Sequence, residues 1–395
     1  LDLGAFARRV PVELFGRTEF RPVDSSPYFL TLGPHGLYWF SLEQRAPARI
    51  SLPSAPLAVE SLPQLTVAET WEEIFEPEGR AGLEAVLPGF LKARRWFGGK
   101  AKEIKSLHLQ ETIAVPHETG NAFVGLVTVD YSQGDPETYV LPLAFATGAA
   151  ADQLPRHAPH FAIARLTLTA RKQDGLIYDA VGSKAFCCGL LELITRRRNA
   201  KGRAGELLAS NTPVLRRIRG EEPAPLEPAP ARAEQSNSSV IYGDQLILKL
   251  FRRLEIGTNP ELEIGRFLTE REFAHTAPLA GALEYCSAGE DMGTVAVLSG
   301  FVAGAKDAWE YTLDALSRYH ERVQSLQSSL PAPPAFEGTM VDAAAREFPP
   351  AVREIVGTYV ESARLLGKRT AELHLILASN LEAKEFAPEP FTPHY

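Results

Sequence analysis

One stretch of the chain decides its fold, and it reads Glu234-Gln-Ser-Asn-Ser-Ser-Val-Ile-Tyr-Gly-Asp-Gln-Leu-Ile-Leu-Lys-Leu-Phe251. A loop of small polar residues comes first, followed by a short strand, a two-residue Gly243-Asp244 turn and a second strand with Lys249 in its middle. Glycine and aspartate between two apolar runs are typical of a β-hairpin. Because an isolated buried charge is costly, Lys249 requires an anionic partner, and a nucleotide phosphate is one such partner.

The two faces of the predicted hairpin differ in chemistry. Side chains alternate along a strand, so Lys249 shares its face with Ile247 and Phe251, whereas three leucines share the opposite face. The polar loop before the hairpin can surround phosphates with hydroxyl and backbone N–H groups, although it lacks the glycine pattern of a P-loop. The predicted phosphate-facing residues of this loop are Gln235, Ser236, Asn237, Ser238 and Ser239.

A capped, acidic helix is predicted directly after the hairpin. Asn259 is a good N-cap, and Pro260 suits the first helical position. Glu261 and Glu263 suit the positive end of the helix dipole, and either could pair with Lys249, as a strand lysine pairs with a helix glutamate in kinases. The alternative is that both glutamates only complete the helix cap and that Lys249 is a surface lysine of an edge strand.

The chain after this helix fits a kinase hinge and its helical lobe. Strands are expected at 281–285 and 294–302, and the second leads through Ala303-Gly304 into a helical region. Apolar residues at helical spacing predict one helix over 309–323 and a second, long helix over 355–373.

The middle of the chain predicts an antiparallel sheet with helices. Four main strands are expected, at 105–113, 122–131, 138–145 and 162–170. A helix before them leads into Arg94-Arg-Trp-Phe-Gly-Gly-Lys100, which is either an anion or carbohydrate contact or a helix C-terminus with cations against the dipole. The run of arginines at 196–198 is likewise either an anion site or a solvated helix end.

Composition limits the classes of function. The chain has 395 residues, a formal net charge of −8 and three cysteines, two of them adjacent. The length suggests roughly two to four domains, and the charge argues against a general role in nucleic-acid binding. The cysteines form neither a disulfide framework nor a zinc motif, which favours a cytoplasmic setting. No stretch approaches the ~20 apolar residues of a membrane span, so no membrane partner is predicted.

The hairpin and the acidic helix after it, Asn259-Pro-Glu-Leu-Glu-Ile-Gly-Arg-Phe-Leu-Thr-Glu270, resemble maltokinases. Arg94–Lys100 is similar to the cap signature of that family, and Gly367-Lys-Arg-Thr-Ala-Glu-Leu-His374 is similar to an early helix of its C-lobe. The family phosphorylates maltose with ATP to give maltose 1-phosphate. Its fold is the aminoglycoside-phosphotransferase branch of the protein-kinase-like fold, with an added N-terminal cap domain.

The resemblance implies roles for individual residues, with ATP and Mg²⁺ as cofactors. Lys249 would contact the ATP phosphates, and Glu263 would be its ion-pair partner, with Glu261 as the alternative. The loop 235–239 would face the phosphates. The hinge beside adenine would consist of Ser299, Phe301 and Val302, mainly through its backbone, because the acidic residue expected near Ser299 is absent.

The front of the chain is similar to the C-terminal β domain of trehalose synthase, which interconverts maltose and trehalose. The similarity lies in Val10-Pro-Val-Glu-Leu-Phe-Gly-Arg-Thr18 and in Pro27–Phe40, a predicted hairpin turning at Gly33–Gly36. We therefore interpret the chain as part of a trehalose synthase–maltokinase fusion in the route from trehalose to glycogen. The expected fold class is α+β. The expected divisions are a partial β domain (1–52), the cap (65–220), a kinase-like N-lobe (231–302) and the start of the C-lobe (303–395).

The catalytic loop of the kinase family and its metal motif do not occur before Tyr395. The magnesium ligands and the general base are therefore expected beyond this sequence, and we expect the chain by itself to be inactive. Two other functions stay open. One is a glucan-binding module in which the hairpin is only structural, and the other is a module that assembles the two enzymes, with an oligomer formed through the trehalose synthase part.

Overall fold

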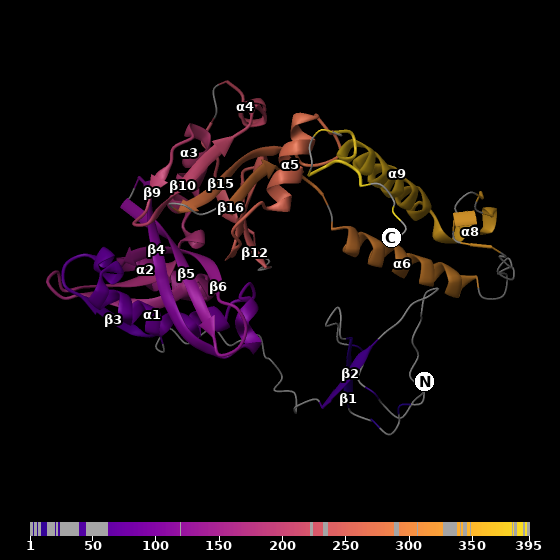
Figure 1. Cartoon of the computed structure of the whole chain (residues 1–395). Coiled ribbons are helices and arrows are strands. Elements are labelled where there is room, and N and C mark those ends of the chain that lie inside the picture. The colour runs from indigo at the N-terminus through magenta and orange to yellow at the C-terminus, as the bar shows by residue number, and fades with distance from the viewer. Residues whose placement is uncertain are drawn as a thin grey trace. The chain divides into compact units, whose positions relative to one another are not determined.

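Figure 1 shows the computed structural model of the chain. The structure describes residues 9–13, 39–44, 62–118, 120–221, 224–231, 236–287, 292–305, 307–326, 349–380 and 385–389, together with positions 3, 6, 20, 23, 338–339, 341–342, 346–347, 382 and 392. The chain divides into two compact units, Leu1–Ser61 and Leu62–Tyr395.

In the described part of the first unit, two strands form an antiparallel pair. Strand β1 (Arg9–Glu13) pairs with β2 (Phe40–Gln44), in register from Arg9 opposite Gln44 to Glu13 opposite Phe40. Val10, Pro11 and Val12 of β1 are all buried, so this strand is covered on both faces. The hairpin predicted between 28–32 and 37–42, with its glycine turn, lies mostly outside the described residues.

A long antiparallel sheet opens the second unit, with strand order β3-β7-β8-β6-β5-β4. The four strands predicted here are confirmed, and most are longer than expected. Only β3 pairs in parallel, with β7. The strands are β3 (Gln64–Val67), β4 (Ile104–His117), β5 (Gly120–Tyr131), β6 (Glu137–Thr147), β7 (Ala162–Leu168) and β8 (Gln173–Asp179).

Helix α1 (Pro77–Lys92) covers one face of this first sheet through Leu83, Leu87 and Leu91, which are fully buried against apolar side chains of β4, β5 and β6. Shorter helical segments connect the strands. They are η3 (Trp71–Phe75), η4 (Gly98–Ala101), α2 (Gly148–His157), η5 (Pro159–Phe161) and η6 (Ala180–Gly182).

A second antiparallel sheet follows, with strand order β11-β12-β13-β16-β15-β10-β9. Helix α5 (Pro260–Glu270) packs against one face, where Leu262, Leu279 and Val297 form a small core. The strands are β9 (Ala200–Lys201), β10 (Gly205–Asn211), β11 (Pro228–Pro230), β12 (Asn237–Tyr242), β13 (Leu246–Phe251), β15 (Leu279–Ser287) and β16 (Gly293–Gly300).

Helix α3 (Lys184–Arg196) joins the two sheets into one apolar core. It contacts β4 of the first sheet and β10, β11 and β15 of the second (Figure 1). Ser183 caps its start, and Arg197 ends it with a φ of 50°. The arginines at its end have protein partners, because Arg196 pairs with Glu192 and Arg197 donates to Asn211. The short helix α4 (Pro213–Arg219) follows β10.

The two sheets also exchange strands. Strands β9 and β10 come from the part of the sequence assigned to the cap, yet they lie in the second sheet. In the opposite direction, β14 (Arg253–Leu254) follows β13 after one residue and pairs with β6 of the first sheet. The extended segment from Leu246 to Leu254 therefore serves both sheets.

Within the described ranges of the chain, the helices α6 (Ala308–Ser325), α8 (Pro350–Val356) and α9 (Tyr359–Leu377) follow the second sheet. The single long helix predicted over 355–373 is wrong, because Gly357 adopts a φ of 70° and ends α8 before α9 begins. Tyr311 of α6 stacks on Tyr359 of α9 at 6.0 Å between ring centroids. The α+β class is confirmed. Among the described residues, no helix is both long enough and apolar enough to cross a membrane.

Candidate functional site

The predicted hairpin is present, with a three-residue rather than a two-residue connection. Tyr242 lies opposite Leu246, so Gly243, Asp244 and Gln245 form the loop. Gly243 has a φ of 58°, which glycine adopts at little cost. The Gln245 carbonyl then accepts a hydrogen bond of 2.8 Å from the Phe301 N–H. The tip of the hairpin is therefore tied to the residue that follows β16.

Lys249 lies on the more open face of β13, as the alternation predicted. The three leucines of the strand are buried, whereas Ile247, Lys249 and Phe251 are half-buried. Lys249 lies between Ser239 of β12 and Val297 of β16, so it is in a central strand and not in an edge strand. Its ammonium lies 5.2 Å from the centroid of the Phe251 ring, and its side chain is 35% exposed.

Glu261 of α5 is the ion-pair partner of Lys249. The expectation that Glu263 is the partner of Lys249 is therefore wrong, and the alternative, Glu261, is correct. The reason is helix geometry, because residues two apart in an α-helix point to nearly opposite sides. Asn259 caps α5 by accepting hydrogen bonds from the N–H groups of Glu261 and Leu262, which fixes the first turn beneath the pair.

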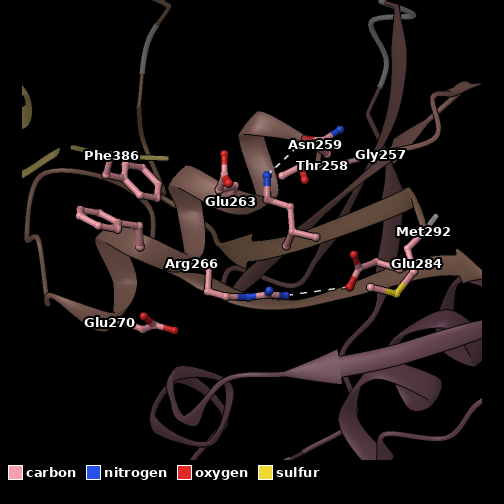
Figure 2. A pocket seen from close by; sticks show the side chains of 11 residues that line it. Gly257, Thr258, Asn259, Glu263, Arg266, Glu270, Glu284, Met292 and Phe386 are labelled. Atoms are coloured by element: carbon pink, nitrogen blue, oxygen red, sulfur yellow. Dashed lines mark hydrogen bonds and ion pairs between the residues drawn. The ribbon is translucent and has the colours of Figure 1, made fainter. Parts of the chain in front are cut away.

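Glu263 faces a different pocket, of about 470 Å³, on the other side of α5. Figure 2 shows the Arg266 side chain extended toward Glu284, with the charged groups 3.9 Å apart. Phe267 of α5 stacks on Phe386 at 3.8 Å, which closes one end of this pocket. Its lining mixes acidic, basic and apolar groups and does not include Lys249.

The polar stretch before Lys249 is mostly strand and not a free loop, which corrects the expectation. Asn237, Ser238 and Ser239 belong to β12 and pair with Phe251, Leu250 and Lys249. Ser236 lies exposed just before the strand, and its hydroxyl accepts a hydrogen bond from the Asn237 amide. Gln235 lies outside the described residues. The backbone groups of β12 are therefore largely committed to the sheet.

The predicted hinge lies where β16 ends. Ser299 lines a pocket of about 430 Å³ together with Glu261 and Val297. Phe301 follows the strand, and Val302 is 58% exposed. The structure therefore brings Ser299 to the same pocket as the glutamate that holds Lys249.

Arg252 is a site residue that sequence reasoning missed. Its side chain is 1% exposed, and its Nη2 lies 2.7 Å from Asp179 Oδ2 at the end of β8. Its Nε donates to the Ser238 hydroxyl at 2.8 Å, and its guanidinium lies 4.6 Å from the Trp96 ring centroid. No sequence signal distinguished it from Arg253, since both follow the same apolar strand and only the fold buries one of them.

The Arg94–Lys100 motif buries its aromatic rings and Arg94, whereas Arg95 and Lys100 are exposed. Trp96 and Phe97 are 5% and 2% exposed, and Arg94 is also buried, against Phe90. A Cβ on Gly99 would lie 2.2 Å from the Tyr131 hydroxyl, so only glycine fits there. This geometry argues against a carbohydrate contact through the two aromatic rings. Helix α1 ends at Lys92, just before the motif.

A cluster of charges around the buried Glu137 lies beside this motif. Glu137 accepts hydrogen bonds of 2.6 Å from Tyr131 and Tyr139, and Lys102 and Arg253 lie 3.1 and 3.5 Å from its carboxylate. Burial alone would raise the pKa of Glu137, but these hydrogen bonds lower it to about 2. Burial and the bond to Glu137 raise the pKa of Tyr139 to about 12.

Comparison with known proteins bears on two parts of the chain. Residues 90–182 match the family model of the maltokinase N-terminal cap domain, and residues 1–39 match that of the maltogenic amylase C-terminal domain. Residues 90–182 are therefore similar to a maltokinase cap domain. Both resemblances drawn from the sequence are therefore confirmed, in the expected order along the chain.

The curated relatives match over short stretches. A trehalose synthase of Pimelobacter sp. (strain R48) is 55% identical over 42 residues, which are 11% of this chain and 7% of that protein. A trehalose synthase of Thermus thermophilus is 32% identical over 121 residues, covering 27% of this chain and 12% of that protein. The chain thus spans a small part of the length of these relatives. A glucosamine kinase solved with glucosamine, ADP and phosphate is 17% identical, with a TM-score of 0.41, over 79% of this chain and 53% of that one.

Proposed function

We propose that the second unit is the phosphate-holding half of a maltokinase, which transfers the γ-phosphoryl group of ATP to maltose. The observation that carries the proposal is the Lys249–Glu261 pair, formed between a central strand and a capped helix in a chain whose residues 90–182 are similar to a maltokinase cap domain. A strand lysine held by a helix glutamate is the arrangement with which kinases orient a lysine toward the α- and β-phosphates.

The residues around Lys249 fit such a ligand. An ammonium group has three N–H donors, and Glu261 takes one of them. Lys249 would hold the nucleotide phosphates, the Ser236 hydroxyl at the edge of β12 would assist, and Ser299, Phe301 and Val302 would lie beside the adenine. Bound ATP would supply the transferred phosphoryl group. Mg²⁺ would neutralise negative charge on the ATP phosphates.

We further propose that this unit works in one polypeptide with trehalose synthase, on the route from trehalose to α-glucan. The match of residues 1–39 to an amylase-type C-terminal domain supports this combination. All three cysteines are free, which supports a cytoplasmic setting. ATP and maltose would then be the partners of the kinase part.

Nucleotide binding by the chain tests the proposal. We expect ATP or a non-hydrolysable analogue to raise the thermal midpoint of unfolding, because a ligand that binds the folded state stabilises it. Lys249→Ala should abolish this shift. The matched control is Lys184→Ala, which removes the lysine of another exposed Lys–Glu pair, 2.6 Å from Glu227, outside the proposed site.

Two outcomes would count against the proposal. One is an equal nucleotide effect in wild type and in Lys249→Ala. The other is binding of a maltodextrin without any nucleotide effect, which would favour a carbohydrate-binding module instead.

A further inference from the structure

Lys249 and Glu261 form an ion pair, although eleven residues separate them in the sequence. The middle of this connecting segment is hydrogen-bonded to the first sheet. The Arg252 carbonyl oxygen accepts a hydrogen bond of 2.8 Å from the Val140 N–H, and Arg253 and Leu254 pair with Tyr139 and Thr138 of β6. The segment then returns to the second sheet, where Ile256 bridges to Gly293. The path from the lysine to the glutamate therefore passes through the cap.

The contact that anchors this path is polar and buried. The two oxygens of Asp179 have separate tasks, because Oδ2 pairs with Arg252 at 2.7 Å and Oδ1 accepts the Val181 N–H at 3.1 Å. Arg252 in turn donates to Ser238, which lies next to the residue opposite Lys249. A fully buried pair with fixed geometry constrains direction as well as distance, unlike an apolar contact.

We propose that Arg252 and Asp179 are positioning residues, through which the cap sheet sets the geometry of the Lys249–Glu261 pair. The expected effect on nucleotide affinity rests on the proposed function. A second expected effect, on the start of α5, needs no nucleotide. The start of α5 should loosen when the anchor is weakened, although Arg252 and Asp179 do not belong to α5.

Amide hydrogen exchange of the full chain, read by mass spectrometry, tests the anchor directly. Asp179→Asn keeps the size of the side chain and the acceptor for Val181 but removes the charge that faces Arg252. We expect exchange in 255–263 to become about tenfold faster or more, because local opening there no longer has to break a charged contact. If Asp179→Asn does not fold, Arg252→Lys keeps a positive charge but loses the fork that reaches both Asp179 and Ser238, and the same acceleration is expected.

The matched control is Leu166→Ala in β7, a fully buried side chain on the α1 side of the same sheet. It lowers the stability of the cap without touching β14. We expect its exchange in 255–263 to change no more than in the rest of the second sheet. Equal acceleration in Asp179→Asn and in this control would overturn the proposal, because the anchor would then be a general contribution to stability.

Nucleotide affinity supplies a second readout. Asp179→Asn should weaken binding about fivefold, a usual size for coupling between two sites. In a Glu261→Gln background, where the pair is already broken, the same substitution should have little further effect. Additive losses would contradict positioning through the pair. Absence of nucleotide binding in the wild type would refute the proposed function alone, because the exchange result decides the anchor independently.

Discussion

Two ion pairs are formed by residues three apart in the chain, Lys249 of β13 and Arg252 just after that strand, and they differ in almost every physical respect. Asp179–Arg252 is closed, with side chains 2% and 1% exposed, whereas Lys249–Glu261 is open, at 35% and 47%. The closed pair joins Arg252 to β8 of the first sheet, and the open pair joins Lys249 to α5. A closed pair is costly to break but offers nothing to a ligand, while an open pair adds little stability and keeps a cation available. The comparison separates the framework of the proposed site from its chemistry.

The largest effect should come from breaking the closed pair. Arg252→Ala leaves Asp179 buried without its cation, and we expect a loss of about 3–5 kcal/mol in the free energy of unfolding, measured with urea. The double variant Asp179→Leu/Arg252→Met sharpens the test. Because it removes both charges and refills the volume, its stability should return close to that of the wild type. A small loss in Arg252→Ala would mean that the pair is not closed.

A smaller loss of unfolding free energy is expected at Gly99, where a larger side chain has no room. Gly99→Ala would place a methyl group against the Tyr131 hydroxyl and the Phe97 ring. We expect it to cost about 1–3 kcal/mol of unfolding free energy, the usual range for overpacking. Gly89→Ala is the control, because nothing lies within 4 Å of the added Cβ and the site is inside α1. Equal stability of the two variants would contradict the close packing of the motif.

The buried Glu137, in the first sheet, should make the free energy of unfolding depend on pH. The pKa of Glu137 is lowered from 4.5 to about 2 in the folded protein. Its contribution to stability is therefore present above pH 4.5 and is lost as the pH falls toward 2, with about one proton taken up on unfolding in that window. The difference in stability between wild type and Glu137→Gln should shrink as the pH falls from 5 to 2.5. A difference that stays constant would exclude a lowered pKa.

The smallest effect on stability should come from the open pair. Lys249→Ala or Glu261→Gln should change the free energy of unfolding by less than about 1 kcal/mol, the range for exposed pairs. Nucleotide binding should nevertheless be lost in Lys249→Ala. Breaking the open pair should therefore cost little stability but abolish nucleotide binding, whereas breaking the closed pair should cost much stability. A loss of several kcal/mol in Lys249→Ala would show that the lysine is framework too.

Local sequence signals predicted the surroundings of the open Lys249 pair well and those of the closed Arg252 pair poorly. Alternation along β13 placed Lys249 on the correct face, and the Asn259-Pro260 signal placed the start of α5. The choice between Glu261 and Glu263 failed because the sequence does not tell which side of α5 meets the sheet. Arg252 could not be found, since its side chain is buried against Asp179 and Trp96, which lie much earlier in the chain. The same holds for β10, whose partner β15 lies far along the chain.

The short strand β14 has a consequence for how the molecule can be assembled. It extends the first sheet along β6 at Thr138 and Tyr139, residues beyond the stretch of β6 that pairs with β8. Until residue 254 has been synthesised, that backbone edge has no native strand to cover it, and open edges invite pairing with other chains. The first sheet and the lysine-bearing hairpin also share one apolar core, so we expect a fragment that ends before residue 254 to aggregate more readily than the full chain.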